Sequence, residues 1–303
     1  LLQPDKNKYN CAEIVKKVLI LKSLNNKMML LGVYIQKKSL EADPRFIAMA
    51  KQLSDSGCEL YTLDEHSDLR LGTDAVLSVG GDGTFISAAS LVVDSEVPIL
   101  GVNLGRLGFL SENEPEDVAE PLLKNDFKVE TRTMLSATLT RNNIPVGPDF
   151  WPYAMNEVTV HRSGAAIMGI DVSIDGSALP TYWADGLLVA TTLGSTAYSL
   201  SAGGPICMPD ARVLIVAPIA PHNLNLRPLV VPKTSVIEIS LEVRDEKAVL
   251  TLDNRTMEIS PDTKLRVSMA QFSLKRIKLP KANFVKALVS KLHWGEDIRN
   301  NGD

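Results

Sequence analysis

Cysteine and histidine are both scarce in this chain of 303 residues. The three cysteines, Cys11, Cys58 and Cys207, are odd in number, lie far apart and form no Cys-x-x-Cys pair. The four histidines are scattered as well, and no His-x-x-x-His pair occurs. These absences exclude a disulfide framework and a zinc site of ordinary ligand spacing. The cysteine usage is typical of a reducing compartment, so we expect a cytoplasmic protein.

The chain also lacks an excess of positive charge and a long apolar run. Lysine and arginine number 32 against 36 aspartates and glutamates, a net charge of −4, so nucleic acid is not expected as a partner. The longest apolar stretch, 28–35, is far shorter than the roughly 20 residues of a membrane-spanning helix. The first residues include Asp5 and Glu13 and no long apolar region, so we expect neither a secretory signal nor membrane association.

The length suggests about two domains, and the hydrophobic pattern changes near residue 130. Before that point, strand-length apolar runs alternate with helical patterns, which indicates βαβ units and a buried parallel sheet. After it, short segments of period two indicate antiparallel β structure. We predict an α/β domain with a parallel sheet over 28–130 and an all-β antiparallel domain over 131–279. Residues 1–27 are a lead-in of unknown role, and 280–303 should form a helix that packs back on the α/β domain.

The expected elements can be given by residue range. The α/β domain should contain strands at 29–35, 74–79 and 98–102 and helices at 44–56 and 85–93. The all-β domain should contain strands at 134–140, 157–160, 170–174, 186–190, 236–241, 248–252 and 264–268. Helical patterns also occur at 11–24 and 283–292.

A glycine-rich loop, Gly80-Gly81-Asp82-Gly83-Thr84, joins an expected strand to an expected helix. Its glycines let the backbone approach a ligand closely, and the N–H groups and positive dipole end of the following helix suit a phosphate. The loop differs from both the P-loop and the Gly-x-Gly-x-x-Gly fingerprint. An acidic residue would repel a phosphate, so Asp82 should meet a hydroxyl or a metal ion. The alternative is an Asp-Gly hairpin turn, which would need a strand after it.

Two further motifs are weaker by themselves. Asn103-Leu-Gly105-Arg-Leu-Gly108-Phe-Leu follows the next strand, where open α/β sheets bind ligands, although it could also be a helix-capping loop. Asn156-Glu157 opens a strand of the second domain. An amide beside a carboxylate can hydrogen-bond a ribose diol or an adenine edge, although the dipeptide alone is more typical of a solvated strand end.

The segment 184–205 is dense in small and hydroxyl residues. It runs from a strand through Gly194-Ser195 into an expected short helix that begins near Thr196. A core does not need so many small polar residues together, whereas a loop that wraps a polar ligand does. The alternative is a connector rich in serine and glycine that binds nothing.

Together these motifs resemble those of the NAD kinase family, over roughly residues 29–290. The motifs in the family's order and spacing are Gly80-Gly-Asp-Gly-Thr84, Asn103-x-Gly-x-Leu-Gly-Phe-Leu110, Asn156-Glu157, Asp185-Gly186 and Gly194-Ser-Thr-Ala-Tyr198. The glycine-rich loop is shared with diacylglycerol and sphingosine kinases and resembles a phosphofructokinase loop. The Gly-Ser-Thr-Ala-Tyr block is more specific to NAD kinases.

The resemblance implies a fold, a reaction and partners. NAD would lie between the two domains, and its adenosine 2′-hydroxyl would take the γ-phosphoryl group of ATP, or phosphate from polyphosphate, to give NADP. Mg²⁺ would accompany the ATP, with no metal site assigned to the protein. Family members are generally dimers or tetramers, and the edge-rich β domain also favours a homo-oligomer.

The resemblance also implies roles for individual residues. Asp82 matches the catalytic acid/base, Asn156 and Glu157 match the pair on the ribose and nicotinamide side of NAD, and Asp185 matches the contact to the nicotinamide amide. The stretch that holds adenine and ribose is matched by Thr196, Ala197, Tyr198, Ser199, Leu200 and Ser201. The phosphate loop is matched by Gly80, Gly81, Gly83 and Thr84, and Asp82 and Gly83 also belong to the NAD-binding set.

The chain departs from the family pattern at four places. One is the first strand and its loop, Tyr34-Ile-Gln-Lys-Lys38, which match the family poorly. The loop 191–196 lacks a proline that is common in the family. Many members have Asp-Gly-Gln where this chain has Asp253-Asn254-Arg255, and Arg255 could alter contacts across a subunit interface or to a diphosphate. The segment before Asp185 lacks the basic residue of some bacterial members, which leaves the choice between NAD and NADH open.

Two other functions compete with an ATP-dependent NAD kinase. A lipid kinase of the diacylglycerol or sphingosine type would need an apolar channel, and the sequence contains no apolar stripe that suggests one. A non-catalytic nucleotide sensor on the same fold should have lost the acid that Asp82 supplies. The sequence therefore favours the NAD kinase.

Overall fold

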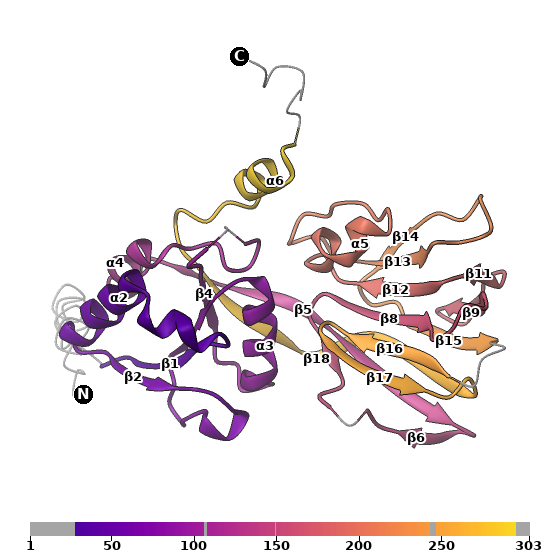
Figure 1. The fold of residues 1–303 in the computed structure, drawn as a ribbon, viewed down its shortest axis with the longest axis horizontal. Coiled ribbons are helices and arrows are strands. Elements are labelled where there is room, and N and C mark those ends of the chain that lie inside the picture. Colours follow the sequence, from indigo (N-terminus) through magenta and orange to yellow (C-terminus); the bar gives the residue numbers. More distant parts are fainter. Residues whose placement is uncertain (1–27, 106–107, 149, 243–246, 295–303) are drawn as a thin grey trace, which may run out of the picture.

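The N-terminal half of the chain is an α/β domain. The structure is a computed structural model that describes residues 28–105, 108–148, 150–242 and 247–294. The lead-in 1–27 and the end of the expected C-terminal segment lie outside these residues. Figure 1 shows this half with its strands between helices. Its elements, with 3-10 helices labelled η, are β1 (Leu30–Tyr34), η1 (Lys38–Ala42), α2 (Pro44–Asp55), β2 (Glu59–Thr62), η2 (His66–Asp68), β3 (Ala75–Val79), α3 (Asp82–Val92), β4 (Ile99–Val102), η3 (Pro115–Asp117) and α4 (Ala119–Leu123).

The strands of this half form a parallel sheet in the order β4-β3-β1-β2. β3 and β4 are buried along their whole length, because helices cover both faces of the sheet. Side chains such as Leu77 and Leu100 pack toward α2 and α4, whereas Val76 and Ile99 pack toward α3. The expected βαβ arrangement is confirmed.

The helix α3 begins at Asp82, three residues earlier than expected. Gly81 is its N-cap, and the backbone N–H groups of Thr84 and Phe85 donate to the Gly81 carbonyl. The hydrophobic pattern does not reveal this start, because Gly83 in the first turn contributes no apolar side chain. Asp82 therefore stands in the first turn of the helix, not in the loop before it.

The C-terminal half is made of antiparallel strands in two packed sheets. One sheet has the order β14-β13-β12-β8-β16-β17, and the other continues as β10-β9-β15-β18, with β5, β6, β7 and β11 at its sides. Inward-facing side chains of both sheets share one hydrophobic core. The elements are β5 (Lys128–Arg141), β6 (Ile144–Val146), β7 (Tyr153–Ala154), β8 (Glu157–Arg162), β9 (Met168–Ile174), β10 (Ser177–Ala178), β11 (Tyr182–Ala184), β12 (Gly186–Ala190), η4 (Gly194–Thr196), α5 (Tyr198–Ser201), β13 (Val213–Ile219), β14 (Leu229–Pro232), β15 (Ile237–Glu242), β16 (Ala248–Leu252), β17 (Arg255–Ile259), β18 (Thr263–Lys278) and α6 (Phe284–Leu292).

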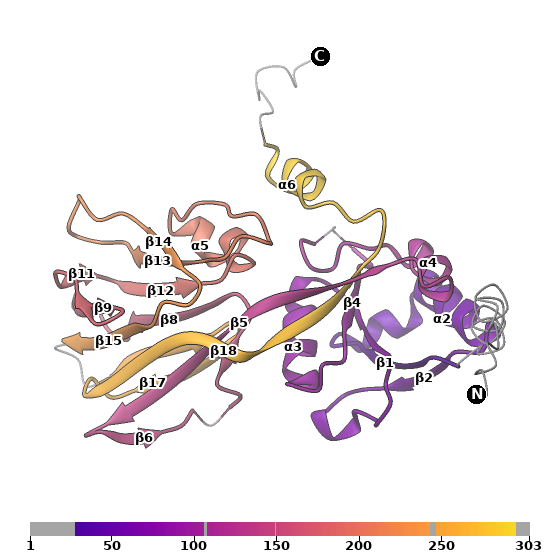
Figure 2. The same cartoon turned by 180° about the vertical axis from the view of Figure 1, so that it is seen from behind.

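Two long strands join the halves. β5 and β18 pair antiparallel over most of their length, with an irregularity in β18 between Met269 and Ser273. β18 also pairs in parallel with β4, through Arg276 and Ile99, so the parallel sheet and one of the β sheets are continuous. Figure 2 shows both strands crossing from one half to the other. The expected boundary at residue 130 falls inside β5, and the domain limits stay a prediction.

The helix α6 stands above the junction of the two halves (Figure 1). The side chain of its N-cap, Asn283, accepts a hydrogen bond from the backbone N–H of Lys286. Its first residue, Phe284, lies against Phe109 of the α/β half, with the ring centroids 5.7 Å apart. Among the described residues, no helix combines the length and the apolar character needed to cross a membrane.

Candidate active site

A cavity of about 510 Å³ opens where the two halves and α6 meet. Its walls come from the start of α3, the loop after β4, β5, β18, the turn after β12 and one side of α6. Four of the predicted residues line it, namely Asp82, Asn156, Thr196 and Ala197. The charged residues that line it without having been predicted are Glu112, Glu130, Arg132, Asp210, Arg276, Lys278 and Lys291.

The Asp82 carboxylate is anchored by the loop after β4. Its Oδ1 accepts hydrogen bonds from the backbone N–H groups of Leu110 (2.9 Å) and Ser111 (3.0 Å), and its Oδ2 accepts one from Phe109 (2.9 Å). A Cβ at Gly108 would lie 1.9 Å from Oδ1, so glycine is needed for the loop to come this close. The first two sequence motifs therefore meet at one side chain.

Asp82 is ionised at neutral pH. Burial raises the pKa of its carboxyl, but the three backbone hydrogen bonds and the positive charge of Lys291 together hold that pKa below its ordinary value. The Nζ of Lys291 lies 3.4 Å from Oδ2. The side chain of Asp82 is 30% exposed, which leaves it accessible from the cavity.

The glycines of the 80–84 loop differ in what they do. Gly80 has a φ of +149°, and a Cβ there would lie 2.4 Å from Thr84 Oγ1, so this position requires glycine. Gly81 and Gly83 are exposed and have open space where a Cβ would stand. A ligand could approach the backbone there, but neither glycine lines the cavity, and the phosphate role of the loop stays a prediction.

A second buried carboxylate, that of Asp253, positions Asn156 and Glu157. Asp253 is in the turn between β16 and β17, with a φ of +52°. It accepts hydrogen bonds from the backbone N–H groups of Met155 (2.8 Å), Asn156 (2.7 Å) and Glu157 (3.2 Å). Its side chain is 1% exposed. In the sequence this aspartate stands out only as part of a departure from the family pattern, because nothing local shows that it reaches residues about a hundred positions earlier.

Glu157 is protonated at neutral pH. Its side chain is buried, and this burial, together with the nearby charge of Asp253, raises the pKa of its carboxyl to about 8. Its Oε2 is buried and has no hydrogen-bond partner within the described part of the chain. A buried carboxyl that keeps its proton can donate a hydrogen bond to a ligand oxygen.

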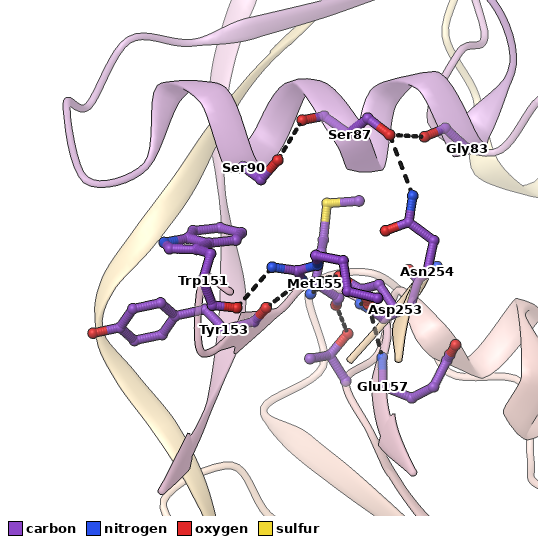
Figure 3. A network of polar contacts seen from close by, with 12 residues as sticks. Gly83, Ser87, Ser90, Trp151, Tyr153, Met155, Glu157, Asp253 and Asn254 are labelled. Atoms are coloured by element: carbon purple, nitrogen blue, oxygen red, sulfur yellow. Dashed lines mark hydrogen bonds and ion pairs between the residues drawn. The ribbon is translucent and has the colours of Figure 1, made fainter. Parts of the chain in front are cut away.

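The turn that contains Asp253 also connects to α3 (Figure 3). The Nδ2 of Asn254 donates to Ser87 Oγ (3.2 Å), and this hydroxyl donates in turn to the Gly83 carbonyl (3.2 Å). The turn thus links the backbone that presents Asn156 to the first turn of the helix that presents Asp82.

Arg255 is engaged within the chain. Its guanidinium donates to the carbonyls of Trp151 (2.7 Å) and Tyr153 (2.6 Å), and it lies 3.6 Å from the Asp253 carboxylate. Its carbon Cζ also stands 5.2 Å from the Trp151 ring centroid. Arg255 does not line the cavity, and its contacts hold the segment before β8. Its expected role at an interface or a diphosphate stays a prediction.

The turn after β12 is packed closely against the strand that carries Asn156. Thr191 Oγ1 donates to the Met155 carbonyl (2.6 Å) and accepts from the backbone N–H of Leu193 (3.1 Å). A Cβ at Gly194 would lie 2.2 Å from the Asn156 carbonyl oxygen, so glycine allows the approach. The proline that the family commonly has in this loop would fall at Thr192, whose Oγ1 donates to the Pro209 carbonyl (3.2 Å).

The predicted NAD-binding stretch is a 3-10 turn followed by a single helical turn, η4 and α5. Thr196 and Ala197 line the cavity, whereas the remaining four predicted residues of the stretch, Tyr198, Ser199, Leu200 and Ser201, do not. Ser199 is buried, and its hydroxyl has no partner among the described residues. Gly204 packs against it, because a Cβ there would lie 2.3 Å from Ser199 Oγ.

Asp185 lies outside the cavity beside a basic residue. The Nε of Arg162, on the neighbouring strand β8, donates to Asp185 Oδ1 at 2.7 Å, and this contact lowers the pKa of the Asp185 carboxyl. The rings of His161 and Tyr198 stack next to this pair, with centroids 5.8 Å apart. The basic residue beside Asp185 thus comes from a strand about twenty residues earlier in the sequence.

Ion pairs formed by residues of β5, β18 and the loop after β4 line the cavity. Arg276 pairs with Glu112, and Arg132 pairs with Glu130. Burial lowers the pKa of the Arg276 guanidinium to about 10. Lys278 Nζ lies 3.4 Å from Glu130. These residues cannot be recognised from the sequence, because charged residues at the end of an alternating strand are typical of a face exposed to solvent.

The described residues offer no dedicated metal cage. No group of three or more histidines, cysteines, aspartates or glutamates among them is placed to hold a metal ion. Three cavity carboxylates are already engaged, Asp82 by backbone N–H groups and Glu112 and Glu130 by cations. The residues present therefore do not fit an ion held by protein ligands alone.

Family models match both halves of the chain. The ATP-NAD kinase N-terminal domain matches residues 3–125, and the ATP-NAD kinase C-terminal domain matches residues 155–279. Curated relatives agree with them. An NAD kinase of Flavobacterium psychrophilum is 41% identical over 239 residues, 78% of this chain and 81% of the relative. An NAD kinase of Porphyromonas gingivalis is 38% identical over 272 residues, 88% of this chain and 89% of the relative.

Solved structures have the same fold. A yeast NADH kinase complexed with NADH matches with a TM-score of 0.77 and 22% identity, over 91% of this chain and 90% of that one. An NAD kinase from Archaeoglobus fulgidus in complex with ATP matches with a TM-score of 0.70 and 26% identity, over 88% of this chain and 99% of that one. The expected fold class is confirmed, and the lipid-kinase alternative finds no support. The two domain models and the curated relatives show that this chain belongs to the NAD kinase family.

Proposed function

We propose that the chain phosphorylates the adenosine 2′-hydroxyl of NAD in the cavity between its halves, with Asp82 as the base. One observation supports this most strongly. Asp82 of the α/β half lines the same cavity as Asn156 and Ala197 of the β half. A carboxylate, an amide and a small residue beside open space suit a ribose hydroxyl and the flat face of a base.

The proposed role of Asp82 follows from the chemistry of phosphoryl transfer. A ribose hydroxyl is a poor nucleophile at neutral pH, and the transfer depends on alignment and on neutralisation of charge. A lowered pKa keeps Asp82 ionised, so that it can orient the hydroxyl and accept its proton as the oxygen–phosphorus bond forms. The bond between the γ-phosphorus and its bridging oxygen breaks, and ADP leaves.

The β half would hold the rest of NAD. Asn156 presents an amide to the cavity. Glu157, protonated, would donate a hydrogen bond to a ribose or amide oxygen from behind Asn156. Thr196 and Ala197 would contact the adenosine, and Asp185 would meet the nicotinamide end.

The proposal also covers the phosphoryl donor, the metal ion, the oligomeric state and the cellular compartment. The donor is ATP, and the metal is Mg²⁺, which would enter with the nucleotide because the described residues supply no cage for it. A homo-oligomer is supported by the dimers and tetramers that are general in the family. A cytoplasmic location is supported by the small, odd number of widely spaced cysteines, which suits a reducing compartment.

The activity itself is tested by incubating the protein with ATP and Mg²⁺ and either NAD or diacylglycerol. We expect NADP from the first mixture and no phosphatidate from the second. An enzymatic assay specific for NADP and thin-layer chromatography of the lipid provide the two measurements. Phosphatidate without NADP would replace the proposal by the lipid-kinase alternative.

The role of Asp82 is tested by Asp82→Asn. We expect kcat for NADP formation to fall by about 10²–10⁴-fold, the scale of general acid–base catalysis. The variant should also unfold at a temperature a few degrees lower, because the amide nitrogen cannot accept from Phe109, and an unpaired buried donor costs about 1–3 kcal/mol. Asp94→Asn, the same change at an exposed site just beyond α3, is the control and should retain full activity. Retention of more than a tenth of the wild-type kcat by Asp82→Asn would show that Asp82 is not the base.

The protonation of Glu157 is tested through the pH dependence of stability. A carboxyl whose pKa is higher in the folded than in the unfolded chain stabilises the fold fully below the unfolded pKa, and this contribution is lost as the pH rises through the folded value near 8. The free energy of unfolding should therefore fall between pH 6 and pH 9, and Glu157→Gln should reduce this fall by about 2 kcal/mol. Urea titrations at both pH values measure it. The exposed Glu242→Gln should leave the fall unchanged, and an equal effect of both substitutions would contradict the assignment.

A further inference from the structure

The C-terminal helix brings one cation into the cavity that the function proposed above does not use. Lys291 lies in the last turn of α6 and lines the cavity together with Phe284 and Leu292 of the same helix. Its Nζ stands 3.4 Å from Asp82 Oδ2 and 4.2 Å from the centroid of the Phe109 ring. Its side chain is 27% exposed, so it can reach a ligand in the cavity.

The acceptor positions of Asp82 show why this contact matters. A carboxylate has about four lone-pair positions. Backbone N–H groups of the loop after β4 occupy three of them, and Lys291 occupies the fourth. A substrate hydroxyl can therefore reach Asp82 without breaking the loop only at the position where Lys291 now stands.

The other cations of the cavity are not available in the same way. Arg276 and Arg132 are buried and paired with Glu112 and Glu130, and Lys278 also faces Glu130. Within the described ranges, Lys291 has Asp82 as its carboxylate partner and an aromatic face as its other contact. It can leave Asp82 at little cost, because an ammonium contact at 3.4 Å on a partly exposed side chain is weak.

Phe109 is a second link between α6 and Asp82, besides Lys291 itself. Phe109 donates its backbone N–H to Asp82, and its ring packs against Phe284 and under the ammonium of Lys291. The helix that carries the cation therefore rests on the loop that orients the carboxylate. This arrangement fixes the ammonium next to the place where the reacting oxygen must bind.

We propose that Lys291 is a catalytic residue, whose ammonium moves from Asp82 to the phosphoryl group in transfer when the hydroxyl takes its place on the carboxylate. The inference rests on the proposed function. The ammonium keeps its proton throughout, while the hydroxyl proton goes to Asp82 and the electron pair of the broken phosphorus–oxygen bond leaves with ADP. The positive charge offsets the negative charge on the transferred oxygens, as phosphoryl transfer requires.

The test compares Lys291→Met and Lys291→Arg with a matched control on the same helix. Lys286 is exposed and does not line the cavity, so Lys286→Met removes the same charge elsewhere on α6. Lys291→Met should lower kcat about 10²–10³-fold, the usual scale for the loss of one group that stabilises transition-state charge. The Kd of ATP should change by less than about fivefold, Lys291→Arg should recover at least a tenth of the wild-type kcat, and the control should be unchanged.

A second measurement separates catalysis from anchoring of the helix. ADP and aluminium fluoride in the presence of NAD imitate the transferred phosphoryl group, so they should inhibit the wild-type enzyme at least tenfold more strongly than Lys291→Met, whereas ADP alone should inhibit both alike. Equal inhibition of both proteins by ADP and aluminium fluoride would overturn the proposal. So would a Lys291→Met variant that retains more than a tenth of kcat. If Lys291→Met unfolds, the charge-retaining Lys291→Arg carries the test, and full inactivity of this variant in a folded state overturns it.

Failure of this inference is distinguishable from failure of the proposed function. A wild-type protein that makes no NADP from NAD and ATP contradicts the function itself. A wild-type protein that makes NADP at a rate indifferent to Lys291 contradicts only the role of the lysine.

Discussion

The candidate active site depends on one type of interaction that occurs twice. In each case a partly or fully buried aspartate accepts hydrogen bonds from three consecutive backbone N–H groups. Asp82 gathers those of residues 109–111, and Asp253 gathers those of residues 155–157. Hydrogen bonds to a charged acceptor are stronger than neutral ones, so each carboxylate fixes a loop that no regular ladder would hold. The first loop surrounds the proposed base, and the second presents Asn156 and Glu157.

The two loops that these aspartates fix must keep their positions relative to one another, and the fold provides two connections between them. The long strands β5 and β18 carry one sheet from the parallel half into the antiparallel half. The hydrogen bonds from Asn254 to Ser87 and from Ser87 to Gly83 join the Asp253 turn to the first turn of α3 (Figure 3). These connections set the distance between Asp82 and the start of β8, whereas α6 adds a side chain from a third direction.

The sequence predicted much of the fold, and it singled out Asp82, which lines the cavity. Apolar runs at β3 and β4 are fully buried, and the glycine-rich loop stands at a helix start, because these features are local. β13 was not predicted, although its sequence is an apolar run like those of β3 and β4. The edge strand β2 was missed because it buries only Tyr61.

What the sequence could not show are contacts between distant segments. An Asp-Asn turn between alternating strands is a recognisable hairpin signal, but the reach of Asp253 to residues 155–157 depends on the tertiary fold. The same holds for Lys291, which resembles any cation near a helix end, and for the paired charges of Arg276 and Glu112. The contacts of Arg255 with two carbonyls about a hundred residues earlier are of the same kind, and its expected role at an interface or a diphosphate stays a prediction.

The central claim is that Asp82 meets the 2′-hydroxyl of the adenosine ribose. A crystal structure of the protein with bound NAD tests it most directly, through the distance between the Asp82 carboxylate and the 2′ oxygen. We expect that distance to be about 2.6–3.2 Å, within the reach of a general base. A well-ordered NAD whose 2′ oxygen lies more than about 5 Å from Asp82, with the nicotinamide ribose beside the carboxylate instead, would contradict the account.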